Sequence, residues 1–237
     1  MTNVKRGNLI FLLIAVVVTT VVVGCGNADV NNGNINNDNI DNPITDNENT
    51  NNEYDVITEE IVRNHKVTPA SDFKYAEVAG GIEIRDYTGK DQIVVIPETI
   101  EGQKVVAISG YIFANDSTVR GIYIPSSITT LVATFPNNDD LEVVICEGVE
   151  KIVDQAFLNC KNLHTVILGK SLNELGERAF AGCKALTELY IAPSLININP
   201  SYSSMLFYKC ENLTIKGQKD SYIENFCNEH GIPFVAV

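Results

Sequence analysis

The chain has 237 residues, a formal net charge of −13 and a hydrophobic fraction of 45%. That length accommodates one ordinary domain with appendages, and the apolar fraction is sufficient for a continuous core. Nucleic-acid binding requires a basic surface that neutralises phosphates, and this acidic sequence has no basic stripe, so nucleic acid is excluded as a partner. The six cysteines include no Cys-x-x-Cys pair, and small disulfide scaffolds are shorter and richer in cysteine, so neither a disulfide framework nor a zinc ribbon is expected.

Residues 1–24 are predicted to be a lipoprotein signal peptide. A short basic start precedes an apolar run over 9–23, which is too short to span about 30 Å of hydrocarbon as a helix. The run ends in Val22-Val23-Gly24-Cys25, which resembles the bacterial lipobox. The resemblance implies that Cys25 carries a diacylglyceryl group and becomes the mature N-terminus, at the bacterial cell surface and lipid-anchored to the membrane on its extracytoplasmic side. An uncleaved anchor with an incidental cysteine is the alternative.

Residues 25–66 are predicted to form a disordered tether. Asn and Asp dominate the stretch to about residue 55, and its isolated aliphatic residues fit no helical or strand period. Such a segment cannot bury enough apolar surface to offset its conformational entropy. A prion-like polar tract and an acidic calcium site are the alternatives, although the acids show no calcium-loop register.

Residues 67–92 are predicted to contain a hairpin that caps the folded domain. Two runs of alternating apolar and polar residues, 73–78 and 82–87, flank Gly80-Gly81, and this pattern is typical of two strands joined by a tight turn. A stack of repeats needs its first coil covered, and this hairpin can cover it.

Residues 93–219 repeat a short pattern and predict a solenoid. Phenylalanines recur with spacings of 22, 22, 23 and 27 residues, and an aliphatic residue follows six positions after each. Residues nine and eleven positions after the first four phenylalanines alternate in the manner of a short strand with one buried face. With an incomplete leading copy at Val94 and Ile96, we expect five strands stacked in parallel, so that like positions form apolar ladders. The phenylalanines are Phe113, Phe135, Phe157, Phe180 and Phe207.

Three cysteines also recur in phase, each three residues after its phenylalanine: Cys160, Cys183 and Cys210. We interpret them as small, buried packing residues. A disulfide or a metal site remains the alternative, because sulfur geometry cannot be deduced from sequence.

Residues 220–237 are predicted to close the stack at its C-terminal end. Ser221 and Glu224 match a capping box, and apolar residues then fall on one helical face. Gly231 fits a helix stop, and 233–235 is a final extended piece.

The phrase Ala-Phe-x-x-Cys-x-x-Leu occurs at 156–163 and again at 179–186. Together with Ile124-Pro125-Ser126-Ser127-Ile128 and the ending 221–234, it resembles the BspA-like leucine-rich repeat family over about residues 80–237. The resemblance implies a β-rich, α/β-type repeat solenoid with short parallel strands on one face and helical turns opposite. It also implies a surface or secreted bacterial protein linked to adhesion and protein binding, and it brings no catalytic residues. No cofactor or metal is expected. Residues 137–140 and 199–204 depart from the repeat.

A candidate binding surface follows from the strand register. If residues nine and eleven after each phenylalanine are buried, residues eight and ten face outward and form an apolar stripe that ends in aromatic residues. Exposed stripes of this kind often mark partner sites, although β-branched residues also simply suit strands. The predicted partner-binding residues are Tyr123, Ile145, Ile167, Tyr190, Thr165 and Glu188.

The function predicted from the sequence is binding of a protein partner on a host or bacterial surface, without catalysis. His65, His164 and His230 are scattered, and no metalloprotease, nucleophile-elbow or phosphate-loop motif occurs. Three alternatives stay open. The chain could bind glycans or peptides for uptake through Tyr123 and Tyr190, serve as a passive envelope component, or hold a catalytic constellation without a motif.

Overall fold

The computed structural model describes residues 56–115, 117–198 and 203–237. The predicted signal peptide, Cys25 and most of the predicted tether therefore lie outside the described residues. None of the helices in the described part of the chain has the length and apolar character needed to cross a membrane.

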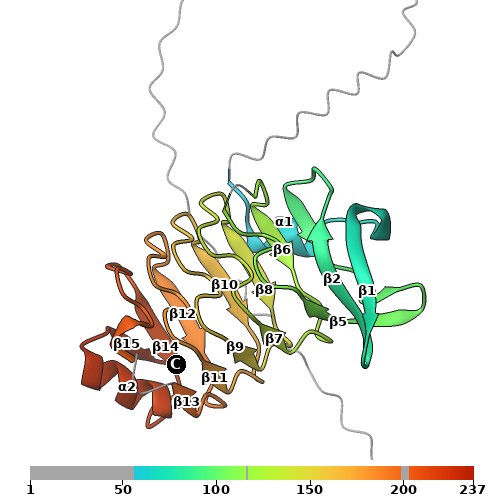
Figure 1. Ribbon diagram of the computed structural model, residues 1–237. Helices are drawn as coiled ribbons and strands as arrows, with labels where there is room; N and C mark the ends of the chain where they lie inside the picture. The colour runs from blue at the N-terminus through green and yellow to red at the C-terminus, as the bar shows by residue number, and fades with distance from the viewer. Residues whose placement is uncertain (1–55, 116, 199–202) are drawn as a thin grey trace, which may run out of the picture. The chain divides into compact units, whose positions relative to one another are not determined.

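Short parallel strands stack into a ladder, which confirms the predicted repeat solenoid (Figure 1). Neighbouring strands pair in register, with Val143 of one strand between Gly121 and Thr165 of the strands beside it. The first four strands form one hydrogen-bonded sheet and the last three form another. The strands are β3 (Ile93–Val95), β6 (Gly121–Tyr123), β8 (Val143–Cys146), β10 (Thr165–Leu168), β12 (Glu188–Ile191), β14 (Thr214–Gly217) and β15 (Phe234–Ala236).

The prediction of five stacked strands is wrong, because β14 and β15 extend the ladder. The coil that starts at Phe207 has one residue fewer between Leu213 and its strand than the coils before it. Its core residue is therefore Ile215, eight positions after the phenylalanine, and the search at nine and eleven positions missed the strand. The extended piece at the C-terminus is β15, which pairs in parallel with β14.

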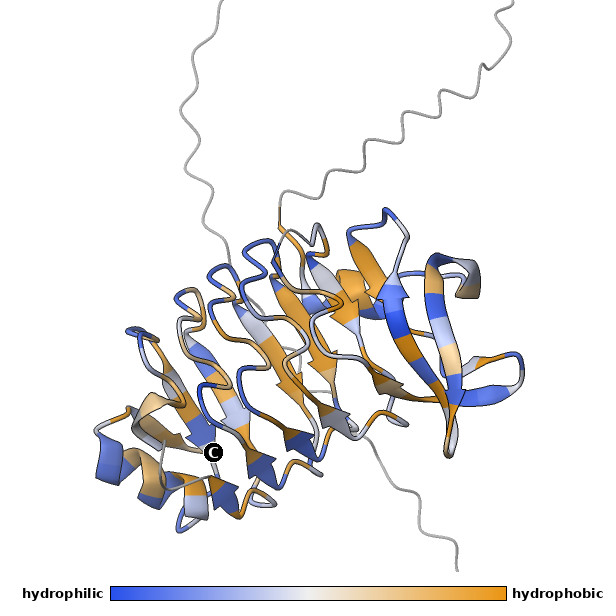
Figure 2. Cartoon of the chain, in the orientation of Figure 1, coloured by the Kyte–Doolittle hydropathy of each residue, from blue (hydrophilic) through white to orange (hydrophobic). Residues whose placement is uncertain are grey.

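Four successive coils also contribute a second, two-residue strand, so the solenoid carries a second parallel ladder. The second residue of each of these strands is buried and the first is exposed or half-buried. Figure 2 shows how hydrophobic and hydrophilic residues are distributed along the coils. They are β7 (Thr130–Leu131), β9 (Lys151–Ile152), β11 (Glu174–Leu175) and β13 (Asn197–Ile198).

The two ends of the solenoid are covered, as the sequence predicts. At the N-terminal end the antiparallel hairpin joins a four-stranded sheet through a parallel pairing of its second strand. That sheet consists of β1 (Phe73–Val78), β2 (Gly81–Tyr87), β5 (Gln103–Ile108) and β4 (Thr99–Ile100), and η1 (Ala70–Asp72) leads into it. At the C-terminal end α2 (Tyr222–His230) begins at the N-cap Ser221 and ends at Gly231, whose φ of 67° is left-handed. Ile223, Phe226 and Cys227 are its buried residues.

The repeated phenylalanines form a continuous stack through the core. Phe135 and Phe157 have ring centroids 5.3 Å apart and an interplanar angle of 5°, and Phe157 and Phe180 are 5.2 Å apart at 16°. The stack continues at both ends with Phe113 and Phe207, at 5.6 and 5.8 Å from their neighbours. The four phenylalanines from 113 to 180 are fully buried, so this stack links every coil to the next.

A left-handed residue follows two positions after each phenylalanine and binds the turns together. Asn137, Asn159 and Gly182 have φ of 59°, 58° and 81°, a region open to glycine and tolerated by asparagine. Each backbone N–H donates to a carbonyl of the following coil at 2.7 Å. The asparagines thus occur where the turn needs them. A short 3-10 helix, η2 (Ser203–Met205), precedes Phe207 in the chain.

The cysteines that recur in the repeats are free thiols that hydrogen-bond between coils. The thiol of Cys160 donates to the carbonyl of Phe135 at 3.1 Å, that of Cys183 to Phe157 at 3.1 Å, and that of Cys210 to Phe180 at 3.0 Å. Cys160 and Cys183 are fully buried, which confirms their interpretation as packing residues. Asn138 takes the corresponding place one coil earlier and donates to the carbonyl of Phe113 at 3.0 Å.

The buried thiols predict that the protein loses stability in alkali. Burial raises the pKa of the Cys160 thiol to about 12, so the folded state keeps a proton that the unfolded chain loses near pH 9. The contribution of the buried thiol to the free energy of unfolding is fully present below pH 9. It declines between about pH 9 and 12, by up to about 1.4 kcal/mol per pH unit. Cys160→Ala should be less stable than the wild type at pH 7.5, and the difference should narrow between pH 9 and 10. Urea unfolding at each pH measures the difference in stability between the two proteins. A difference independent of pH would contradict the raised pKa of the Cys160 thiol.

Candidate functional site

The segment 56–69, called the strap below, crosses the outer face of the first strand ladder. It contains α1 (Glu59–Asn64), whose N-cap Thr58 accepts a hydrogen bond from the Ile61 N–H. Ile57 and Val62 are fully buried in a cluster with residues of β3 and β8. The strand residues of that cluster are Ile93, Val143 and Ile145, with Ile61, Tyr123 and Ile167 at its margin. The N-terminal half of the strand face is therefore covered by the chain itself.

The prediction that 25–66 is entirely a disordered tether is wrong at its C-terminal end. Residues 59–64 are helical, and the strap is ordered by tertiary contact rather than by its own propensity, since a six-residue helix is not stable alone. Its apolar residues Ile57, Ile61 and Val62 bring enough surface to dock, although acids surround them.

Gly121 gives the strap room to approach the strand ladder. The equivalent residues on the flanking strands are Ile93 and Val143, whereas a Cβ at Gly121 would lie 2.7 Å from Val62 Cγ2 and 3.0 Å from Ile57 Cγ2. The first distance is shorter than real Cβ atoms show and the second is tighter than most real Cβ contacts, so a larger residue would force Val62 and Ile57 of the strap to shift. A glycine at the position where the flanking strands carry Ile93 and Val143 is therefore the feature of the sequence that indicates where the strap crosses.

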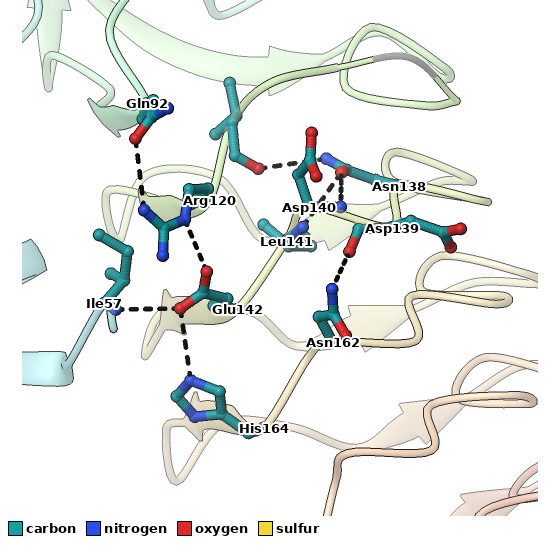
Figure 3. Close-up of polar contacts among 11 residues, drawn as sticks. Ile57, Gln92, Arg120, Asn138, Asp139, Asp140, Leu141, Glu142, Asn162 and His164 are labelled. Atoms are coloured by element: carbon teal, nitrogen blue, oxygen red, sulfur yellow. Dashed lines mark hydrogen bonds and ion pairs between the residues drawn. The ribbon is translucent and has the colours of Figure 1, made fainter. Parts of the chain in front are cut away.

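A polar ladder at the start of the strands holds the N-terminal end of the strap (Figure 3). Glu142 Oε2 accepts from the Ile57 N–H at 2.9 Å, and Glu142 Oε1 accepts from Arg120 Nε at 2.6 Å. The side chains of Glu142 and Arg120 are only 15% and 16% exposed, so this pair is largely desolvated. Gln92 lies 3.4 Å from Arg120 on one side, and His164 Nε2, which is buried without a hydrogen-bond partner, lies 3.7 Å from Glu142 on the other.

Two further contacts fix the rest of the strap. Arg63 donates two hydrogen bonds to the Glu147 carboxylate, at 3.2 and 3.0 Å, and another to Glu59 at 2.7 Å. The hydrogen bonds to Glu147 keep the pKa of Arg63 above its ordinary value. Farther along, Thr68 is buried and exchanges hydrogen bonds with the Val95 backbone, both at 3.0 Å.

The predicted partner-binding residues divide into a covered and an uncovered group. Ile145 is fully buried beneath the strap, so the expectation that it faces solvent is wrong. Tyr123 and Ile167 are half-buried at the margin of the strap cluster. The sequence could place these residues on one face but could not show what covers that face.

The uncovered group lies on β10 and β12, beyond the strap. Tyr190 is 44% exposed, and Glu188 is exposed and accepts from Lys216 Nζ of the next strand at 2.7 Å. Thr165 is half-buried, and its hydroxyl lies 2.9 Å from His164 Nδ1. We call the surface formed by Thr165, Ile167, Glu188, Tyr190 and Lys216 the open face.

The three histidines lie on different elements of the described chain and do not form a cluster. His65 is the C-cap of α1, and His164 directly precedes β10. His230 packs against Phe226 in α2, with ring centroids 4.4 Å apart and ring planes inclined by 58°. The described part of the chain holds no group of three or more histidine, cysteine or acidic residues that could bind a metal ion.

Comparison with known families and structures agrees with this architecture. Residues 133–227 match the BspA type leucine rich repeat region in six copies. The leucine-rich repeat protein of T. pallidum (TpLRR) is 26% identical, with a TM-score of 0.56 over 64% of this chain and 71% of that one. A leucine-rich repeat protein from Bacteroides ovatus is also 26% identical, with a TM-score of 0.48 over 63% of this chain and 46% of that one. No curated protein sequence matches the chain.

Proposed function

Because residues 133–227 are a leucine-rich repeat region of the BspA type, we propose that this chain is a non-catalytic protein-binding module on a bacterial surface. Repeats of this kind are scaffolds that display a surface made of residues varying between coils. The proposed contact surface is the open face. The proposed anchor is a lipid on Cys25, which would hold the module to the membrane on its extracytoplasmic side.

The observation that carries the proposal is the exposure of Tyr190 on an otherwise ordered strand ladder. The corresponding residue of β8, Ile145, is fully buried beneath the strap, whereas Tyr190 is 44% exposed with no element of the described chain above it. Tyrosine offers a large apolar ring with a polar tip, and it is enriched in protein interfaces. The neighbouring pair of Glu188 and Lys216 supplies charges of both signs at the rim, as interfaces commonly do.

The geometry favours a protein over a glycan. A sugar-stacking site needs open aromatic rings, and of the two tyrosines considered for it, Tyr123 is half-buried at the margin of the strap cluster. That leaves one exposed ring, flanked by an ion pair and by aliphatic surface.

A site-specific photocrosslinker tests the proposal in the intact chain. Placed at Tyr190, it should form a discrete adduct with a protein on bacterial or host cells, and placed at Tyr208 it should not. Tyr208 is a matched control because it is also exposed, at 58%, but lies on a turn away from the strands. Tyr190→Ala should then weaken binding of the adduct protein at least tenfold, whereas Tyr208→Ala should leave it unchanged. Equal adducts at both positions would refute the open face as the contact surface.

The anchor is tested separately with an alkyne-labelled fatty acid. Cells that express the wild-type chain should incorporate the label, and cells that express Cys25→Ala should not. Label that persists in the Cys25→Ala chain would refute the lipid attachment.

A further inference from the structure

The strap covers one half of a face whose other half is open. The outer residues of β3, β6 and β8 under the strap, and those of β10 and β12 beyond it, belong to the same ladder and the same side of the solenoid. Beneath the strap the strand face is aliphatic, and Ile93, Val143 and Ile145 are buried in one cluster with Ile57 and Val62 of the strap. Without it, the apolar surface would continue through Ile167 to Tyr190.

The attachment of the strap resembles the docking of a short peptide ligand. A six-residue helix has no stability of its own. Segment 57–63 is held by three aliphatic side chains, by the Glu142 carboxylate, which accepts a backbone N–H, and by one bidentate ion pair. Beyond it, the strap is fixed by the hydrogen bonds between Thr68 and the Val95 backbone. The ion pair is solvent-exposed on both sides, at 35% and 47%, and exposed pairs contribute little. Segment 57–63 is therefore held by an interface of few residues, and its cluster is separate from the main hydrophobic core of the solenoid.

We infer that the strand face beneath the strap is a docking surface for short amphipathic helices, occupied in cis by residues 57–63, and that the strap yields to a competing helix of the same chemistry. That chemistry is defined by the cis occupant. It comprises aliphatic residues at the first, fifth and sixth positions, matching Ile57, Ile61 and Val62, and an arginine at the seventh, which meets Glu147. Glu142 selects the register, because its carboxylate accepts the first backbone N–H. The inference deepens the proposed function by naming how part of the same face is regulated.

Hydrogen exchange on the intact wild-type chain is the first test. The strap should open by itself, so the amide of Val62, which donates to the Thr58 carbonyl, should be protected at least tenfold less than the amides of β8. Equal protection would overturn the inference, because the strap would then open only when the whole fold opens.

Binding of a fluorescent peptide with the sequence of residues 56–69 is the second test. The variant Val62→Asp should release the cis strap and bind the peptide at least tenfold more tightly than the wild type does. Adding Gly121→Val, which fills the floor where Val62 Cγ2 lies, should abolish that binding. A peptide carrying Arg63→Glu should bind more weakly because Glu147 then repels it.

Absence of peptide binding by a Val62→Asp chain that retains its circular dichroism and thermal transition would overturn the inference, as would undiminished binding after Gly121→Val. If Val62→Asp does not fold, hydrogen exchange on the wild type decides alone. Neither test uses Tyr190 or an external partner, so their failure is distinguishable from failure of the open face to bind a protein.

Discussion

Replacing Asn138 by alanine should lower the free energy of unfolding by about 3–5 kcal/mol. The Asn138 side chain is fully buried and uses all its hydrogen-bonding capacity within the solenoid. Figure 3 shows the hydrogen bonds that its oxygen accepts from Asp140 and Leu141. Its amide donates to the carbonyls of Phe113 and Val119 at 3.0 and 3.4 Å, and its oxygen accepts from the N–H groups of Asp140 and Leu141 at 3.0 and 3.1 Å. Alanine would leave these four backbone groups without their partner, and each unsatisfied buried group costs about 1–3 kcal/mol. Urea unfolding followed by circular dichroism measures the loss.

The matched control for this prediction is Asn138→Cys, which installs the residue found at the same place in later coils. A thiol can donate to the Phe113 carbonyl as Cys160 does to Phe135, so part of the loss should be recovered. The N–H groups of Asp140 and Leu141, which donate to the Asn138 oxygen, remain unsatisfied. The free energy of unfolding of the cysteine variant should therefore lie between those of the wild type and the alanine variant. A loss below about 1 kcal/mol for alanine, or identical losses for both variants, would contradict the assigned role of the side chain.

The stacked part of the fold is predictable because equivalent positions in successive coils have the same buried environment and therefore carry similar residues. Phe157 and Cys160 occupy the same environment as Phe180 and Cys183, so their recurrence in phase identifies the core without any knowledge of the structure. The same reasoning explains why Asn138 looked like a departure from the pattern. Its side-chain amide donates the hydrogen bond between coils that a cysteine thiol donates in later coils, and the sequence pattern alone does not show this equivalence.

The last coil was mispredicted for a local reason. One residue fewer between Leu213 and the following strand shifts the core positions, and a search at fixed offsets from Phe207 then falls on the wrong residues. Side chains in strands alternate between faces, so a shift of one residue moves the whole pattern to the other face.

The candidate site was only partly predictable, because exposure depends on segments distant in sequence. The register correctly placed Ile145 and Tyr190 on the same outer side of the ladder, but one is buried and the other is 44% exposed. What separates them is the strap, whose contact between Ile57 and Glu142 joins residues 85 positions apart. Gly121 is the one residue of the outer ladder whose identity indicates the strap, because a side chain there would collide with Val62. The reason for the glycine is evident only when the position of Val62 is known.

Replacing Phe157 by alanine should have the largest effect on stability, about 4–5 kcal/mol. The side chain is fully buried, and its ring stacks on Phe135 at 5.3 Å and on Phe180 at 5.2 Å. Truncation of a buried phenylalanine costs about 3–5 kcal/mol, and each aromatic contact adds about 0.5–1.5 kcal/mol beyond buried area. In a solenoid each coil contacts only its neighbours, so a cavity in a central coil weakens the interfaces on both sides. Urea unfolding gives the magnitude.

The control is Phe207→Ala, in the last phenylalanine coil. Phe207 is 9% exposed, and among the aromatic residues that the structure describes it stacks only on Phe180, at 5.8 Å and 20°. Its truncation should therefore cost less than that of Phe157, by about 1–2 kcal/mol, because one stacking contact is absent and water already reaches the ring. The end coil should also melt earlier than the centre in Phe207→Ala, which hydrogen exchange of β14 against β8 would show, whereas Phe157→Ala should lower protection in both strands. Equal losses for the two variants would mean that the phenylalanine stack contributes only local packing and does not couple one coil to the next.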